Sequence, residues 1–118
     1  MNDADSLIRL RDALRTFAAE RHWEAFHTPK NLAMALAGEA GEVIEHFQWL
    51  SPEASASLAD EQRAEVGLEL ADVLLYLIRL ADVLEVDLVA AAERKIAINA
   101  ERYPVAKTRG RALKYDRL

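Results

Sequence analysis

The chain carries two pairs of acidic residues at a spacing that suits one face of a helix. Glu39 and Glu42 stand three residues apart in the stretch NLAMALAGEAGEVIEHFQWL, residues 31–50, and Glu45 follows three residues later. Glu69 and Asp72 repeat the spacing in GLELADVLLYLIRL, residues 67–80. Side chains three residues apart on an α-helix are neighbours. Carboxylates grouped in this way can hold a hard divalent cation, and one left free of the cation can act as a general base.

The two pairs are expected to face each other. Four like charges placed together are untenable without protons or cations, because each one raises the cost of ionising the others. An all-oxygen ligand set favours Mg²⁺ or Mn²⁺ over zinc. Spacing alone leaves two interpretations open, a metal site and an ordinary solvated acidic face, since such pairs are common on exposed helices.

Other kinds of site have less support in the sequence. A di-iron carboxylate bundle needs Glu-x-x-His on two helices, but His46 follows Val43 at that spacing. His22 and His27 have no helical partner at metal-ligand spacing, which favours a loop or packing role for both. The absence of cysteine excludes disulfides and thiolate metal sites. Without a glycine-rich phosphate loop, any phosphate binding must rely on metal, lysine and arginine.

Four amphipathic helices are predicted to position the acidic residues. Apolar residues recur at steps of three and four, and strand patterns are absent, so the predicted fold is an all-α helical bundle. Glu39 falls within the apolar stripe of the second helix, at a position where the spacing of three and four residues predicts a hydrophobic residue. Capping residues and prolines set the expected bounds at about 5–21, 29–50, 60–84 and 88–103.

Composition and charge restrict the class of partner. The 118 residues predict a helical domain over residues 1–104 and a basic tail over residues 105–118. The net charge is −5; the tail contributes five basic residues and one acid, or +4, which leaves −9 on the rest. An acidic body does not suit a nucleic acid polymer, whereas a small anion such as a nucleotide can bind through cations.

No membrane association is expected from the sequence. No apolar run approaches the ~18 residues that span a bilayer, and the first residues lack a basic segment followed by an apolar one. A soluble cytoplasmic protein is therefore the expectation.

Several aromatic and polar side chains are candidates for nucleotide binding. Trp23, Phe26 and Trp49 could stack on a base, although aromatic residues near helix ends also serve as core or interface residues. Lys95 and Asn99 share a helical face and could contact phosphate, or could belong to a solvated face.

With its flanking motifs, the acidic pattern resembles a known family. E-x-x-E followed after 26 residues by E-x-x-D is similar to the signature of the MazG-like, all-α nucleotide pyrophosphohydrolases. The segments FAAERHWEAFHTPKNL, GEAGEVIEHFQW, GLELADVLLYL and KIAINAERYP resemble the branch of that family that contains dCTP pyrophosphatase. The resemblance extends from about Leu7 to Tyr115.

The resemblance implies an enzyme that uses Mg²⁺ to cleave a nucleoside triphosphate into the monophosphate and pyrophosphate, in the role of nucleotide-pool house-cleaning. It implies an oligomer, a homodimer or homotetramer, and makes residues 1–104 the catalytic domain. The basic tail could then close over the ligand. The implied metal ligands are Glu39, Glu42, Glu69 and Asp72, and the implied substrate-binding residues are Trp23, Trp49, Tyr76, Lys95, Asn99, Arg102, Lys114 and Tyr115.

Some features of the expected activity stay open. Glu39, Glu42 or Glu45 could be the general base, and the sequence does not choose among them. Relatives that prefer dCTP have a histidine in the base pocket where this chain has Leu14, so a dUTP-type or modified pyrimidine substrate is an alternative to dCTP. An alternative to an enzyme is a non-catalytic oligomerisation or partner-binding module of the same fold.

Overall fold

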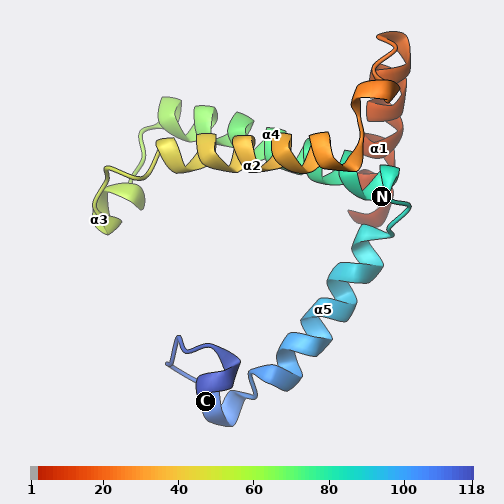
Figure 1. Cartoon of the computed structure of the whole chain (residues 1–118). Coiled ribbons are helices and arrows are strands. Elements are labelled where there is room, and N and C mark those ends of the chain that lie inside the picture. Colours follow the sequence, from red (N-terminus) through yellow and green to blue (C-terminus); the bar gives the residue numbers. More distant parts are fainter. Residues whose placement is uncertain (1–2) are drawn as a thin grey trace. The chain divides into compact units, whose positions relative to one another are not determined.

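The computed structural model describes residues 3–118, and these residues form helices joined by loops, without a strand (Figure 1). The prediction of an all-α fold is confirmed. The four long helices are α1 (Asp3–Glu20), α2 (Pro29–Glu45), α4 (Asp60–Val83) and α5 (Leu88–Arg102). The short ones are the α-helices α3 (Pro52–Ser55) and α6 (Val105–Thr108), and the 3₁₀-helices η1 (Glu24–Phe26) and η2 (Tyr115–Arg117).

The chain divides into two compact units, Met1–Val86 and Asp87–Leu118. The first contains α1 to α4 together with η1, and the second contains α5, α6 and η2. The predicted division of function between residues 1–104 and residues 105–118 stays a prediction. None of the helices in residues 3–118 combines the length and apolar character that crossing a bilayer requires.

An antiparallel pair of helices, α2 and α4, is the centre of the first unit (Figure 1). The hydroxyl oxygen of Thr28 caps α2 by accepting a hydrogen bond from the Asn31 amide at 3.2 Å, and Pro29 occupies the first turn, as the sequence predicted. The α1 helix packs against α4. The buried core comes from all three helices: Ala18, Leu32, Val66, Ile78 and Ala81.

The second helix ends at Glu45, so the prediction that it continues to Leu50 was wrong. The amides of residues 46 and 47 bond to carbonyls three residues back, at 3.2 and 2.9 Å, which tightens the last turn and ends the α-helix. Pro52 begins α3 and requires an extended residue before it, and Ser51 has that conformation, with φ −69° and ψ 159°. The other predicted helix bounds agree to within a few residues.

One apolar face of α4 remains uncovered in the described part of the chain. Apolar residues recur along this helix at steps of three and four, and two of them, Val66 and Ala81, are buried. The remaining leucines keep much of their surface exposed, at 53%, 38%, 36% and 52% for Leu70, Leu74, Leu77 and Leu84. These four residues are spaced as a seam along one helix face.

Candidate functional site

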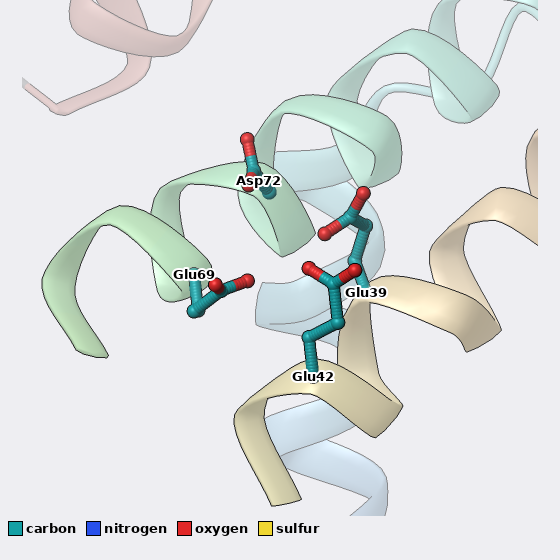
Figure 2. Close-up of side chains that lie close together, drawn as sticks. All are labelled: Glu39, Glu42, Glu69 and Asp72. Atoms are coloured by element: carbon teal, nitrogen blue, oxygen red, sulfur yellow. The ribbon is translucent and has the colours of Figure 1, made fainter. Parts of the chain in front are cut away.

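Four carboxylates converge between α2 and α4 (Figure 2). Glu39 and Glu42 come from α2, and Glu69 and Asp72 come from α4, each pair three residues apart on its own helix. Each side chain offers an oxygen atom such that the four atoms all lie within 4.8 Å of one another. The two acidic pairs that the spacing predicted to face each other therefore do so.

The electrostatics of this acidic cluster favour a bound cation. The Oε2 atoms of Glu39 and Glu69 are buried and have no hydrogen-bond partner among the described residues. Burial raises the pKa of Glu39, and so do its contact with Glu42, with which it can share a proton, and the charges of Asp72 and Glu69. Glu69 also contacts Glu42, and this contact is the largest cause of the raised pKa of Glu69, followed by burial and by the charges of Glu42 and Asp72.

A hard divalent cation fits this ligand set. The donors are all carboxylate oxygens, the ligands that Mg²⁺, Mn²⁺ and Ca²⁺ prefer. Two carboxylate oxygens of the cluster are buried without a hydrogen-bond partner in residues 3–118, and a buried acceptor left unpaired costs free energy that a cation would recover. His46 Nε2 lies 3.9 Å from Glu69 Oε1, and its charge, when present, opposes the rise in the Glu69 pKa. The cluster can thus bind a metal ion.

A cavity of about 310 Å³ adjoins the acidic cluster in the first unit, and Asp72 belongs to both. Tyr76, one turn beyond Asp72 on α4, lines the cavity as well. The Trp23 ring packs edge-on against Phe17 and His27, with centroids 5.7 and 6.2 Å apart. The complete lining is Leu14, Phe17, Trp23, His27, Asp72, Leu75, Tyr76 and Arg79. A mainly apolar cavity next to a cation site offers room for the organic part of an anionic ligand.

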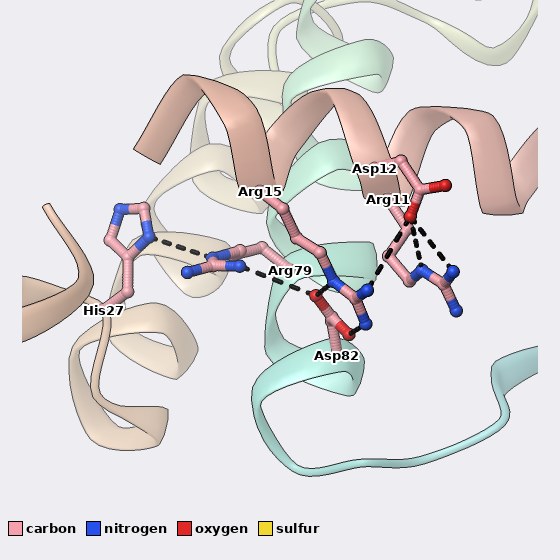
Figure 3. Close-up of polar contacts among 6 residues, drawn as sticks. All are labelled: Arg11, Asp12, Arg15, His27, Arg79 and Asp82. Atoms are coloured by element: carbon pink, nitrogen blue, oxygen red, sulfur yellow. Dashed lines mark hydrogen bonds and ion pairs between the residues drawn. The ribbon is translucent and has the colours of Figure 1, made fainter. Parts of the chain in front are cut away.

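A polar network includes two of the residues that line the cavity, His27 and Arg79 (Figure 3). Arg79 Nε donates a hydrogen bond of 3.0 Å to His27 Nδ1, and Arg79 Nη1 lies 3.5 Å from Asp82 Oδ2. Arg15, on α1, donates two hydrogen bonds to the Asp82 carboxylate, at 2.7 and 2.5 Å. These two bonds are the main reason that the pKa of Asp82 lies below its ordinary value.

Two other predicted site residues of the first unit lie outside the cluster and the cavity lining. Glu45 is the last residue of α2; it is exposed and is not among the four convergent carboxylates. Trp49 follows the end of α2 in a turn and is 88% exposed. Trp23 and Tyr76, in contrast, both line the cavity. The roles assigned to these four residues stay predictions.

The remaining predicted residues belong to the second unit. Lys95, Asn99 and Arg102 are exposed on α5 at steps of four and three, as the sequence pattern indicated. The Tyr115 ring, in η2, lies under the Arg102 guanidinium at 4.7 Å, which ties the end of the chain to α5. Lys114 directly precedes η2. Their proposed contacts with substrate stay predictions.

The sequence analysis missed the part that His27 and Arg79 play in the cavity wall. His27 was assigned a loop or packing role, and Arg79 was not considered. A signal for Arg79 was present, because it is the one cation within the apolar run of residues 73–81 and follows Asp72 by seven residues, two helical turns on the same face. No such signal existed for His27, whose contact with Arg79 joins residues 52 positions apart.

Comparison with known proteins gives consistent results. A model of the MazG-like family matches residues 35–118. Over 104 residues, the chain is 49% identical to dCTP pyrophosphatase 1 of Rattus norvegicus and 45% identical to dCTP pyrophosphatase 1 of Homo sapiens. Each of these matches covers 86% of this chain and 61% of the relative, so the chain spans about three fifths of the length of these curated relatives.

A solved structure is also similar. The crystal structure of a pyrophosphatase from Archaeoglobus fulgidus has 40% sequence identity to this chain and superposes with a TM-score of 0.80. The superposition covers 84% of this chain and 93% of that one.

Proposed function

The chain belongs to the MazG-like family, and we propose that it is a metal-dependent nucleoside triphosphate pyrophosphohydrolase. The observation that carries the proposal is the convergence of four carboxylates, from two helices, within 4.8 Å. The named activities of its relatives, dCTP pyrophosphatase and pyrophosphatase, support the same reaction class.

Glu39, Glu42, Glu69 and Asp72 would hold the metal. Mg²⁺ is the proposed ion and Mn²⁺ its substitute, because both are hard cations that suit carboxylate oxygens. When bound, the metal would supply positive charge for the triphosphate and lower the pKa of a water molecule. The paired arrangement on two packed helices fixes the carboxylates in place without a flexible loop.

The reaction adds one water molecule across the bond between the α- and β-phosphates. The water oxygen forms a bond to the α-phosphorus, and the bond from that phosphorus to the bridging oxygen breaks, giving the monophosphate and pyrophosphate. The proton lost by the water needs a carboxylate base within hydrogen-bond reach. Glu39, Glu42 and Glu45 lie at successive steps of three on α2, and we propose that one of them takes this proton.

The cavity beside Asp72 is the proposed place of the sugar and base. Trp23 would stack on or border the base, and Tyr76, which lines the cavity one helical turn beyond Asp72, would contact the sugar or phosphate. From the second unit, Lys95, Asn99, Arg102, Lys114 and Tyr115 would contribute phosphate and sugar contacts, and the basic tail would close over the ligand. Trp49 would complete the base pocket. The proposed substrate is dCTP or a related pyrimidine nucleotide, with dUTP as the alternative.

We also propose that the protein is a homo-oligomer. The leucine seam of α4, made of Leu70, Leu74, Leu77 and Leu84, is apolar, exposed and regularly spaced along one helix face. A second copy of the chain would bury it by helix packing. Trp49, at 88% exposure, would gain cover in such an assembly.

A non-catalytic helical module of the same fold is the competing hypothesis. Convergent like charge destabilises a bundle that binds no cation, which argues against a module that has kept all four acids.

Purified protein should release pyrophosphate from a nucleoside triphosphate when Mg²⁺ is present. Glu39→Gln and Asp72→Asn should abolish turnover while the helical content stays unchanged. If no member of a broad panel of canonical and modified triphosphates is cleaved by the wild type, the module hypothesis replaces this one.

A further inference from the structure

Arg79 carries a charge in the cavity that its protein partners only partly neutralise. Its side chain is only 11% exposed. The hydrogen-bond partner of its Nε, His27, has its pKa lowered by burial and by Arg79 itself, so the imidazole ring is neutral at pH 7. Asp82 is held by two short hydrogen bonds from Arg15, and Arg79 approaches it only to 3.5 Å. A guanidinium in such surroundings favours an electron-rich ligand group.

The end of the Arg79 guanidinium is available to a ligand. Arginine has five N–H donors in a planar fork. Nε is bonded to His27 and Nη1 is paired with Asp82, whereas Nη2 has no hydrogen bond or ion pair among the described residues. Figure 3 shows this third nitrogen directed away from Asp82. Since Arg79 lines the cavity, Nη2 and the neighbouring N–H of Nη1 can donate two parallel hydrogen bonds into it.

The position of Arg79 along α4 suits the base of a bound nucleotide. Asp72, Tyr76 and Arg79 follow one another at steps of four and three on one helix face, and all three line the cavity. At 1.5 Å per residue, Arg79 lies about 10 Å along the axis from Asp72. A triphosphate held at the acidic cluster would extend its sugar toward Tyr76 and its base toward Arg79. Leu14, which also lines the cavity, has no side-chain group that could form a hydrogen bond to a base.

From this arrangement we infer that Arg79 is the residue that reads the base, and that the base it selects is cytosine; the inference rests on the proposed function. A fork that donates twice needs two adjacent acceptors. Cytosine presents O2 and N3 side by side, and in duplex DNA it accepts from the N1–H and N2–H groups of guanine, which have the geometry of a guanidine. Uracil and thymine place an N3–H donor between their two carbonyl groups, so one N–H group of the guanidinium would face another donor there and could not form a hydrogen bond. His27 positions the fork by holding Nε.

The test compares dCTP with dUTP, which differ at the base edge. Wild-type protein with Mg²⁺ should show a higher kcat/KM for dCTP than for dUTP. Arg79→Gln removes the charged fork and should reduce the dCTP:dUTP ratio by roughly 5- to 150-fold, the discrimination that one bidentate contact to a base supplies. Arg79→Lys keeps the charge and loses the fork, so it should reduce the ratio as well. His27→Leu, which removes the acceptor for Nε, should lower the ratio in the same direction.

The matched control is Arg63→Gln, an identical change on the same helix. Arg63 is 69% exposed and pairs with Asp60 in the first turn of α4, so its loss should leave the ratio unchanged. If Arg79→Gln does not fold, as judged by its helical signal and melting curve, Arg79→Lys supplies the same readout with the ion pair to Asp82 retained.

The possible outcomes separate the two levels of the proposal. If Arg79→Gln lowers kcat/KM equally for all triphosphates, Arg79 contacts phosphate or has a structural role, and the inference is overturned. An unchanged dCTP:dUTP ratio, or a wild-type preference for dUTP, would also overturn it. Each of these results leaves the proposed reaction intact. Absence of turnover with every triphosphate would instead overturn the proposed function, and this inference with it.

Discussion

Metal binding should stabilise the folded protein, and Glu39→Gln should remove most of that effect. A cation that binds only the folded state adds about 2.7 kcal/mol of stability when its concentration is one hundred times its Kd. The unfolding entropy is about 2.1 cal/mol/K per residue, or roughly 0.25 kcal/mol/K for a chain of this length. The expected rise in Tm is therefore about 11 °C.

Glu39→Gln has opposite effects with and without metal. Glu39 has a raised pKa and a buried Oε2 that finds no hydrogen-bond partner in the described part of the chain, so a neutral amide of the same shape should relieve repulsion and raise the Tm measured in EDTA. The same change removes one anionic ligand, so the Mg²⁺-dependent rise in Tm should become small. Both quantities come from melting curves recorded at pH 7.5 in EDTA and in a series of Mg²⁺ concentrations.

Glu65→Gln is the matched control, because Glu65 is exposed on α4 and lies outside the acidic cluster. It should melt as the wild type does in EDTA and show the full Mg²⁺ effect. The reasoning is refuted if Mg²⁺ and Mn²⁺ leave the wild-type Tm unchanged, or if Glu39→Gln and Glu65→Gln respond to metal equally. A fall in the apo Tm of Glu39→Gln would show that the acid has a structural role instead.

The pH dependence, an ion pair and the assembly state supply three further tests. Without metal, stability should fall as the pH rises from 4.5, the ordinary glutamate pKa, through the raised pKa values of Glu39 and Glu69. The reason is that the folded state binds more protons than the unfolded state in this pH range. Melting curves in EDTA should show the fall in stability, and Mg²⁺ should remove or reverse it. Asp82, whose pKa is lowered, contributes stability above about pH 3.8 that is lost as the pH falls through its folded pKa, so Asp82→Asn should cost about 1–3 kcal/mol at pH 7 by urea unfolding, and an unchanged midpoint would contradict this role. Light scattering should find an oligomer for the wild type and smaller particles for Leu74→Glu; a wild-type monomer would contradict the proposed assembly.

Local patterns were sufficient to predict the helices and the acidic cluster. Residues three apart on a helix share a face whatever the rest of the fold does, so spacing alone could place each acidic pair, at Glu39 and at Glu69, on one face of its helix, while it left open whether that face was solvated. Glu39 also interrupts an apolar stripe, which indicated that it points toward the neighbouring helix. Thr28 and Asp87 cap α2 and α5 as their sequence contexts predicted.

The cavity wall and the end of α2 depended on information that local patterns do not contain. The apolar rhythm continues to Leu50, but tight hydrogen bonds at residues 46 and 47 end the helix at Glu45. The contact between His27 and Arg79 depends on how a loop folds over α4, so no spacing rule could predict it. Exposed side chains at the α4 seam could be recognised only once the neighbouring helices were in place.

Product analysis with triphosphates is the most direct test of the central claim, the cleavage between the α- and β-phosphates at a carboxylate-bound metal. Wild-type protein and Glu39→Gln should be incubated with dCTP and Mg²⁺, and the nucleotide and phosphate products separated and quantified. We expect dCMP and pyrophosphate in equal amounts from the wild type, and neither from Glu39→Gln or when EDTA replaces Mg²⁺. Formation of dCDP and inorganic phosphate, or equal turnover by Glu39→Gln, would contradict the proposed reaction.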